Sequence, residues 1–320
     1  MVTACPICPH GCRLAEGQTG LCRARRNVDG LVVPLAADRP CAVAVDPMEK
    51  KPLFHFLPGR PVLSLGMAGC NLRCRNCQNA GISQASPSDI PAAHLAPENV
   101  VALLREKSIP AVAYTYTEPL VCFEYVRDCA CAVHEAGFAN VLVSAGYVNP
   151  GPFSELLPFL DAANIDLKTM SEDGYMSNCG VHRDPVLRTL RTLAQSNVVL
   201  EVTNLVIPGF NDTDGDLRAW CVFVSGELGR DVPVHFSRFF PQYRLTDRPP
   251  TPLETLRRAK KIAGEHGLRH VYCGNVDESE DTYCPGCGTR LVERRGFCVV
   301  ENIVQNGRCP VCGRVLYGRF

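Results

Sequence analysis

The sequence predicts an α/β protein built around an incomplete (β/α)6-type TIM barrel. From about residue 61 to residue 273, short apolar runs alternate with longer segments that have helical spacing or begin with Pro. Regular β–α alternation requires a parallel sheet. The first run leads into Gly66-Met-Ala-Gly-Cys70 and a cysteine loop, not into the Gly-rich phosphate turn of an open doubly wound sheet. Six or seven such units are too few for a closed eight-stranded barrel.

The elements are expected in strict alternation along this stretch. The expected strands are Val62–Leu65, Ala111–Tyr116, Val141–Ala145, Ala163–Leu167, Val198–Val206, Val232–Phe239 and Arg269–Cys273. The expected helices are Pro97–Lys107, Pro119–Ala136, Pro152–Leu160, Pro185–Gln195, Asp214–Leu228 and Pro252–His266. In the last helix, Thr251 and Glu254 form an expected capping box, and Gly267 suits the position after the C-cap.

Two cysteine-rich segments flank the barrel and complete a three-part division. Residues 1–45 are expected to form a metal-binding segment, residues 46–278 the barrel, and residues 279–320 a zinc-ribbon-like domain. The 320 residues carry 33 basic and 33 acidic side chains, so no charged field favours nucleic acid. No apolar stretch is long enough for a membrane span or an export signal. We therefore expect a cytoplasmic protein that binds neither nucleic acid nor membrane.

The 19 cysteines are unusual for a chain of this size. In a reducing compartment, grouped cysteines indicate metals more than disulfides. Cysteines that stand alone inside apolar patterns are expected to be small buried hydrophobes; these are Cys122, Cys129, Cys131, Cys179, Cys221 and Cys273.

Cys70, Cys74 and Cys77 form a C-x3-C-x2-C run directly after the first strand. Three thiolates this close can ligate three corners of a [4Fe–4S] cluster, and the fourth iron can then bind S-adenosylmethionine (SAM). Reductive cleavage of SAM to a 5′-deoxyadenosyl radical is chemistry of the cofactor, so no catalytic side chain is predicted beyond the cluster-bound SAM. The alternative is a tetrahedral zinc site with a fourth ligand from elsewhere in the chain.

The loop resembles the signature of the radical SAM superfamily. The whole chain resembles the radical SAM enzyme of the AmmeMemoRadiSam system, a family related to pyruvate formate-lyase activating enzyme. The resemblance rests on residues 5–12, 46–59, 70–79, 113–119, 164–168, 205–212 and 235–239. It implies an electron donor such as flavodoxin or ferredoxin and an unidentified small-molecule or protein substrate. Activation of a glycyl-radical enzyme and a non-catalytic zinc-ribbon binding protein are the alternatives.

The resemblance also implies where SAM binds. Glu118 is expected to accept from the SAM ammonium group, although a carboxylate before Pro119 also suits a helix N-terminus. Asp166 and Lys168 are expected beside SAM, with a strand-end ion pair as the alternative. His235 resembles a late-strand residue that approaches SAM, with a core histidine as the alternative. Ser144 is a weaker candidate. Asn76 departs from the family, which usually has an aromatic residue there.

The two terminal cysteine groups differ in spacing. Cys284, Cys287, Cys309 and Cys312 form twin C-P-x-C-G knuckles, which indicate structural zinc, with an auxiliary iron site as the alternative. The spacing of Cys5, Cys8, Cys12 and Cys22 is less standard. Zinc, a second iron–sulfur cluster and no metal all stay open for this group, and His10 is a possible substitute ligand.

Overall fold

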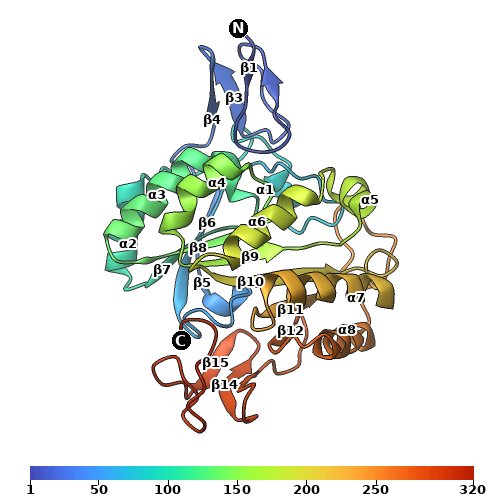
Figure 1. The fold of residues 1–320 in the computed structure, drawn as a ribbon. Helices are drawn as coiled ribbons and strands as arrows, with labels where there is room; N and C mark the ends of the chain where they lie inside the picture. The colour runs from blue at the N-terminus through green and yellow to red at the C-terminus, as the bar shows by residue number, and fades with distance from the viewer.

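The computed structural model describes residues 1–320 and contains an eight-stranded sheet in the order β12-β11-β10-β9-β8-β7-β6-β5. Seven of its strands are parallel and follow one another in chain order, as the sequence predicts (Figure 1). Because β5 and β12 are the two edges of the sheet, the barrel is incomplete. The parallel strands are β6 (Pro61–Gly66), β7 (Ala111–Thr115), β8 (Ala139–Ser144), β9 (Ala162–Asp166), β10 (Val199–Val206), β11 (Val234–Arg238) and β12 (Val271–Gly274).

The six expected helices are present, with bounds within about two residues of the prediction at most ends. They are α2 (Pro97–Glu106), α3 (Phe123–Glu135), α4 (Pro150–Leu156), α6 (Asp184–Ala194), α7 (Asp214–Phe223) and α8 (Leu253–Glu265). Shorter segments lie between or beside them: η1 (Met48–Lys50), α1 (Ala80–Ser83), η2 (Pro119–Cys122), η3 (Leu157–Phe159), α5 (Glu172–Gly174), and the π-helical η4 (Tyr175–Cys179) and η5 (Val224–Leu228). None of the helices is long and apolar enough to cross a membrane.

The capping box predicted for α8 is wrong. Pro252 is the N-cap residue and makes no side-chain cap. The buried Thr251 hydroxyl instead donates to the Val206 carbonyl (2.6 Å) and accepts from the Phe239 N–H (3.0 Å). Val206 is the last residue of β10 and Phe239 directly follows β11, and an unpaired buried backbone group at either place would be costly. Gly267 has the expected left-handed backbone, with φ +79°.

One strand of the main sheet is not among the predicted strands. β5 (Ala42–Pro47) pairs antiparallel with β6, and its last residues lie opposite the first residues of β6. The expected boundary at residue 45 therefore falls inside a strand of the barrel sheet. We call residues 46–59 the barrel floor. They begin with the last two residues of β5, which pair with the first residues of β6, and lie at the amino ends of the parallel strands.

The barrel floor fills the interior of the barrel at that end. Its apolar residues pack against inward-facing side chains that are mostly small: Met48, Leu53 and Phe56 form one buried cluster with Val62, Ala111, Ala113, Ala139, Val141 and Ala162. Alanines on the inner face leave the space that the floor occupies. The Glu201 carboxylate accepts from the N–H groups of Phe54 and His55, at 2.8 and 2.7 Å. His55 is in turn tied to the end of the chain, because its carbonyl accepts from the Arg319 N–H at 2.7 Å.

The flanking segments lie at opposite ends of the barrel (Figure 1). The N-terminal segment contains two hairpins, β1 (Thr3–Ala4) with β2 (Arg13–Leu14) and β3 (Arg25–Val28) with β4 (Leu31–Pro34). These strands of two to four residues are too short to show periodicity in the sequence. The C-terminal segment is a three-stranded antiparallel sheet of β13 (Thr282–Tyr283), β14 (Arg290–Arg295) and β15 (Cys298–Asn302).

Candidate cluster and SAM site

The central cysteine loop begins where β6 ends, at the carboxyl end of the parallel strands. Cys74 is buried, whereas Cys70 and Cys77 are partly exposed. The Cys70 sulfur accepts from the Leu72 N–H at 3.4 Å, and the Cys77 sulfur lies 3.2 Å from the Ser83 hydroxyl. This is the end of a barrel at which active sites form.

A π-helical turn holds the loop from the other side. The N–H groups of Arg73 and Arg75 donate to the carbonyls of Cys179 and Asn178 in η4, at 2.8 and 3.0 Å. The Asn178 amide donates to the Asn76 side chain at 2.9 Å. Asn76 is therefore a polar anchor for the loop, at the position where an aromatic side chain is usual in the resembling family. π-helical turns are frequent at functional sites.

Cys179 has a contact that the sequence did not reveal. It is buried, as predicted, but its thiol also lies close enough to the Cys74 sulfur to lower the pKa of Cys74. The two residues are 105 positions apart, so no spacing pattern links them. Only the path of the chain after β9 brings η4 against the loop.

Glu118 follows β7 and is almost fully buried. The Ser144 hydroxyl, at the end of β8, lies 2.8 and 2.9 Å from its two carboxylate oxygens. The N–H groups of Ala145 and Leu120 donate to it at 2.9 and 3.2 Å. Burial raises the pKa of Glu118 to about 7. The bond from Leu120 caps η2, so the alternative predicted for Glu118 is also present.

All the donors to Glu118 are electrically neutral, which leaves a buried carboxylate without a cation. The carboxylate also acts on the cysteine loop. Burial is the main cause that holds the pKa of Cys70 well above its ordinary value, and the negative charge of Glu118 is the second. Buried carboxylates are normally paired with a positive group. The site therefore fits a ligand that carries an ammonium group between Glu118 and the loop.

Asp166 and Lys168 form an ion pair of 2.9 Å at the end of β9, which was the alternative predicted for them. Burial opposes the charged form of Lys168, but the Asp166 carboxylate and Cys74 hold its pKa well above the ordinary value. The Asp166 side chain is 42% exposed, whereas that of Lys168 is only 18% exposed. The pair thus places a positive charge near Cys74 and leaves the carboxylate accessible.

His235 lies apart from this group. Its Nε2 is 2.7 Å from the Glu201 carboxylate, and both side chains are buried in the barrel. The imidazole packs edge-on against Phe54 and stacks on Tyr272. Through Glu201, which also binds the backbone of Phe54, His235 belongs to the packing of the barrel floor.

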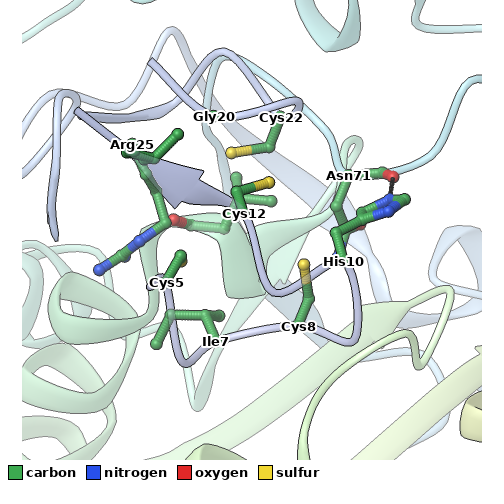
Figure 2. A pocket seen from close by; sticks show the side chains of 11 residues that line it. Cys5, Ile7, Cys8, His10, Cys12, Gly20, Cys22, Arg25 and Asn71 are labelled. Atoms are coloured by element: carbon green, nitrogen blue, oxygen red, sulfur yellow. Dashed lines mark hydrogen bonds between the residues drawn. The ribbon is translucent and has the colours of Figure 1, made fainter. Parts of the chain in front are cut away.

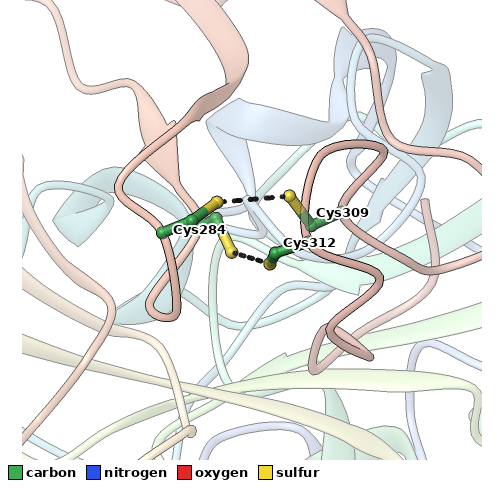
Figure 3. Close-up of side chains that lie close together, drawn as sticks. Cys284, Cys309 and Cys312 are labelled. Carbon is green, nitrogen blue, oxygen red and sulfur yellow. Dashed lines mark hydrogen bonds between the residues drawn. The ribbon is translucent and has the colours of Figure 1, made fainter.

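The C-terminal cysteines form a compact group (Figure 3). The sulfurs of Cys284, Cys287, Cys309 and Cys312 all lie within 4.8 Å of one another, and two of the pairs are 3.6 and 3.7 Å apart. Four Zn–S bonds of about 2.3 Å in a tetrahedron separate the sulfurs by about 3.8 Å. The group therefore has the dimensions of a site for one metal ion.

The N-terminal cysteines line a small cavity of about 20 Å³ (Figure 2). Cys5, Cys8, Cys12 and Cys22 all contribute to its wall. The His10 imidazole lies 2.9 Å from the Asn71 carbonyl, and this bond ties the segment to the central loop.

Fold and site together define a class of protein: a metal-cofactor enzyme that works at the carboxyl ends of an open parallel barrel. Residues 65–221 match the sequence profile of the Radical SAM superfamily. The chain is 44% identical over 313 residues to an uncharacterized protein of Methanocaldococcus jannaschii, MJ0808, covering 97% of this chain and 93% of that protein. The chain belongs to the radical SAM superfamily and is a radical SAM enzyme, which implies a [4Fe–4S] cluster and SAM as cofactors.

More distant relatives agree with this assignment. The chain is 26% identical over 223 residues to pyruvate formate-lyase 1-activating enzyme of Escherichia coli, covering 64% of this chain and 89% of that enzyme. A solved structure of a radical SAM methyltransferase from Sphaerobacter thermophilus superimposes with a TM-score of 0.54 at 17% identity, covering 78% of this chain and 71% of that chain. The latter similarity supports the partial-barrel fold alone.

Proposed function

We propose that Cys70, Cys74 and Cys77 each ligate one iron of the [4Fe–4S] cluster, and that the fourth iron is left for SAM. When bound and reduced, this cofactor pair supplies the 5′-deoxyadenosyl radical that abstracts hydrogen from the substrate. The position of the loop after β6 supports the proposal. Hydrogen bonds from the loop to η4 hold the loop in place.

The uncompensated charge of Glu118 is the observation that carries the SAM site. In our proposal the Glu118 carboxylate accepts from the ammonium group of SAM, and Ser144 orients the carboxylate through its hydroxyl. A cation brought next to a buried carboxylate recovers much of the free energy lost on desolvation.

Lys168 and Asp166 are proposed to complete the site. The ammonium group of Lys168 offsets negative charge on the cluster thiolates, since its charge already lowers the pKa of Cys74. The half-exposed Asp166 is available to accept from a hydroxyl of the ligand. The contacts of His235 favour a role in holding the barrel floor over contact with SAM.

We further propose that the enzyme is of the AmmeMemoRadiSam type and receives its electrons from flavodoxin or ferredoxin. Residues 5–12 and 46–59, which carry the resemblance, lie in the cysteine cavity and in the barrel floor. Hydrogen abstraction from a glycine of a partner protein is the second candidate, and the similarity to pyruvate formate-lyase 1-activating enzyme favours it. In both cases the C-terminal cysteines are proposed to bind structural zinc.

Anaerobic reconstitution, dithionite reduction and addition of SAM test the proposal. We expect a reduced-cluster EPR signal that SAM alters, together with release of 5′-deoxyadenosine. Cys74→Ala should abolish both, whereas Cys131→Ala, on the outer surface of α3, should behave as wild type. Formation of 5′-deoxyadenosine by Cys74→Ala at the wild-type rate would refute the ligand assignment.

A further inference from the structure

The three cysteine groups differ in how tightly their sulfurs gather. The C-terminal group is the one whose sulfurs all lie within 4.8 Å of one another. The N-terminal group and the central triplet are more open, although the N-terminal four line a single cavity. A lone zinc ion requires sulfurs about 3.8 Å apart, whereas a cubane holds its thiolates farther apart because irons and sulfides lie between them. The wider spacing of the N-terminal sulfurs therefore favours a polynuclear group over a lone zinc ion.

The state of the four thiols agrees with the argument from sulfur spacing. None of them is in a disulfide. Thiols become thiolates on binding metal, so four of them around one cavity can all serve as ligands. Figure 2 shows the sulfurs of Cys8, Cys12 and Cys22 turned toward the same space from separate turns of the segment.

Arg25 provides an independent observation. Its side chain is 2% exposed, lines the same cavity, and has an Nε that finds no hydrogen-bond acceptor. The two terminal nitrogens are already paired with the Glu124 carboxylate, at 2.7 and 2.6 Å. An unpaired buried donor is costly, and the guanidinium is close enough to Cys5 for a thiolate there to offset part of that cost.

The cavity also abuts the central loop. The Cys22 carbonyl accepts from the Cys70 N–H at 3.2 Å. This backbone hydrogen bond joins a cysteine of the N-terminal group directly to a cysteine of the central triplet. Gly69 makes this approach possible, because a Cβ at that position would lie 2.6 Å from the Cys22 carbonyl oxygen.

We propose that Cys5, Cys8, Cys12 and Cys22 ligate a second [4Fe–4S] cluster, which relays electrons to the central one. A reduced one-electron carrier gives one electron to the second cluster, and that electron then passes to the central cluster; no bond forms or breaks in the relay. The relay rests on the proposed function of the central triplet. The second cluster itself does not.

Metal content tests the site directly. In anaerobically purified protein we expect about eight irons, eight sulfides and one zinc per chain, and about four irons in either the Cys70→Ala/Cys74→Ala/Cys77→Ala or the Cys8→Ala/Cys12→Ala variant. Unchanged zinc content and a wild-type far-UV circular dichroism spectrum report that each variant is folded. Cys41→Ala is the matched control, because Cys41 lies outside the cavity and its thiol donates to the Gly66 carbonyl. An iron-free central triple variant, or a second zinc in wild type, would overturn the site.

The relay is tested by the choice of reductant. Cys8→Ala/Cys12→Ala should keep dithionite-driven formation of 5′-deoxyadenosine and lose most of the flavodoxin-driven activity. If the Cys8→Ala/Cys12→Ala variant has wild-type activity with dithionite and also with flavodoxin, the relay is overturned. If the central triple variant still makes 5′-deoxyadenosine, the proposed function fails while the second cluster stands.

Discussion

The burial of Glu118 makes a quantitative prediction for Glu118→Gln. A carboxyl whose pKa rises from 4.5 to about 7 on folding makes the folded state about 3 kcal/mol less stable once it is ionised. Below pH 4.5 the group is protonated in both states and this penalty is absent. As the pH rises, the unfolded state ionises first, and stability is lost progressively until the pH passes about 7. Glutamine has no such titration.

The assay compares urea unfolding of the two proteins at pH 4.5 and pH 8, both in the Cys74→Ala background so that no central cluster contributes charge. The difference in unfolding free energy should move in favour of Glu118→Gln by about 3 kcal/mol between the two pH values. Hydrogen bonds lost from Ser144 and Ala145 add an offset, but that offset does not depend on pH.

In the protein with an intact cysteine loop, Glu118→Gln should also weaken SAM binding by about 10- to 100-fold, since a charge-assisted hydrogen bond is lost. Glu135→Gln, on an exposed carboxylate of α3, is the control for both measurements. A pH-independent stability difference, or a shift in the opposite direction, would refute the reasoning. Unchanged SAM affinity would remove Glu118 from the site.

Three further perturbations address other parts of the molecule. Arg294→Met leaves the buried Glu49 without its cation, 3.5 Å away, and should lower the urea unfolding free energy by about 3 kcal/mol, unlike replacement of an exposed arginine. Cys284→Ser should release zinc and lower the melting temperature; retention of stoichiometric zinc would contradict the ribbon assignment. Gly69→Ala, with φ +92° and a Cβ against the Cys22 carbonyl, should reduce iron content, and full iron occupancy would show that the contact is dispensable.

Much of the barrel was predictable because its signal is local. Apolar runs such as Ala111–Tyr114 in β7 and the proline starts of the helices depend only on neighbouring residues. β5 was not predicted although Ala42–Val45 is itself a short apolar run, because it stands outside the β–α alternation, with no helix between it and β6. Its place is fixed by pairing with β6.

The candidate site also contains some residues with a local sequence signal and others that depend on tertiary packing. The spacing of Cys70, Cys74 and Cys77 is visible in the sequence, and strand ends predict that Glu118 and Asp166 face the same side. The Cys179 contact and the His235–Glu201 pair depend on tertiary packing, which brings together residues 34 or more positions apart. Thr251 shows the converse, since a local capping signal yields to two strand-end backbone groups.

The barrel floor has a consequence for the order in which the molecule folds. The His55 imidazole is hydrogen-bonded to the Tyr317 carbonyl, and the backbone of His55 and Leu57 to that of Arg319, about 260 positions later in the chain. Contacts of such long range form late and slow folding. We therefore expect the contacts between the barrel floor and the C-terminal segment to form late in folding, after the local hairpins.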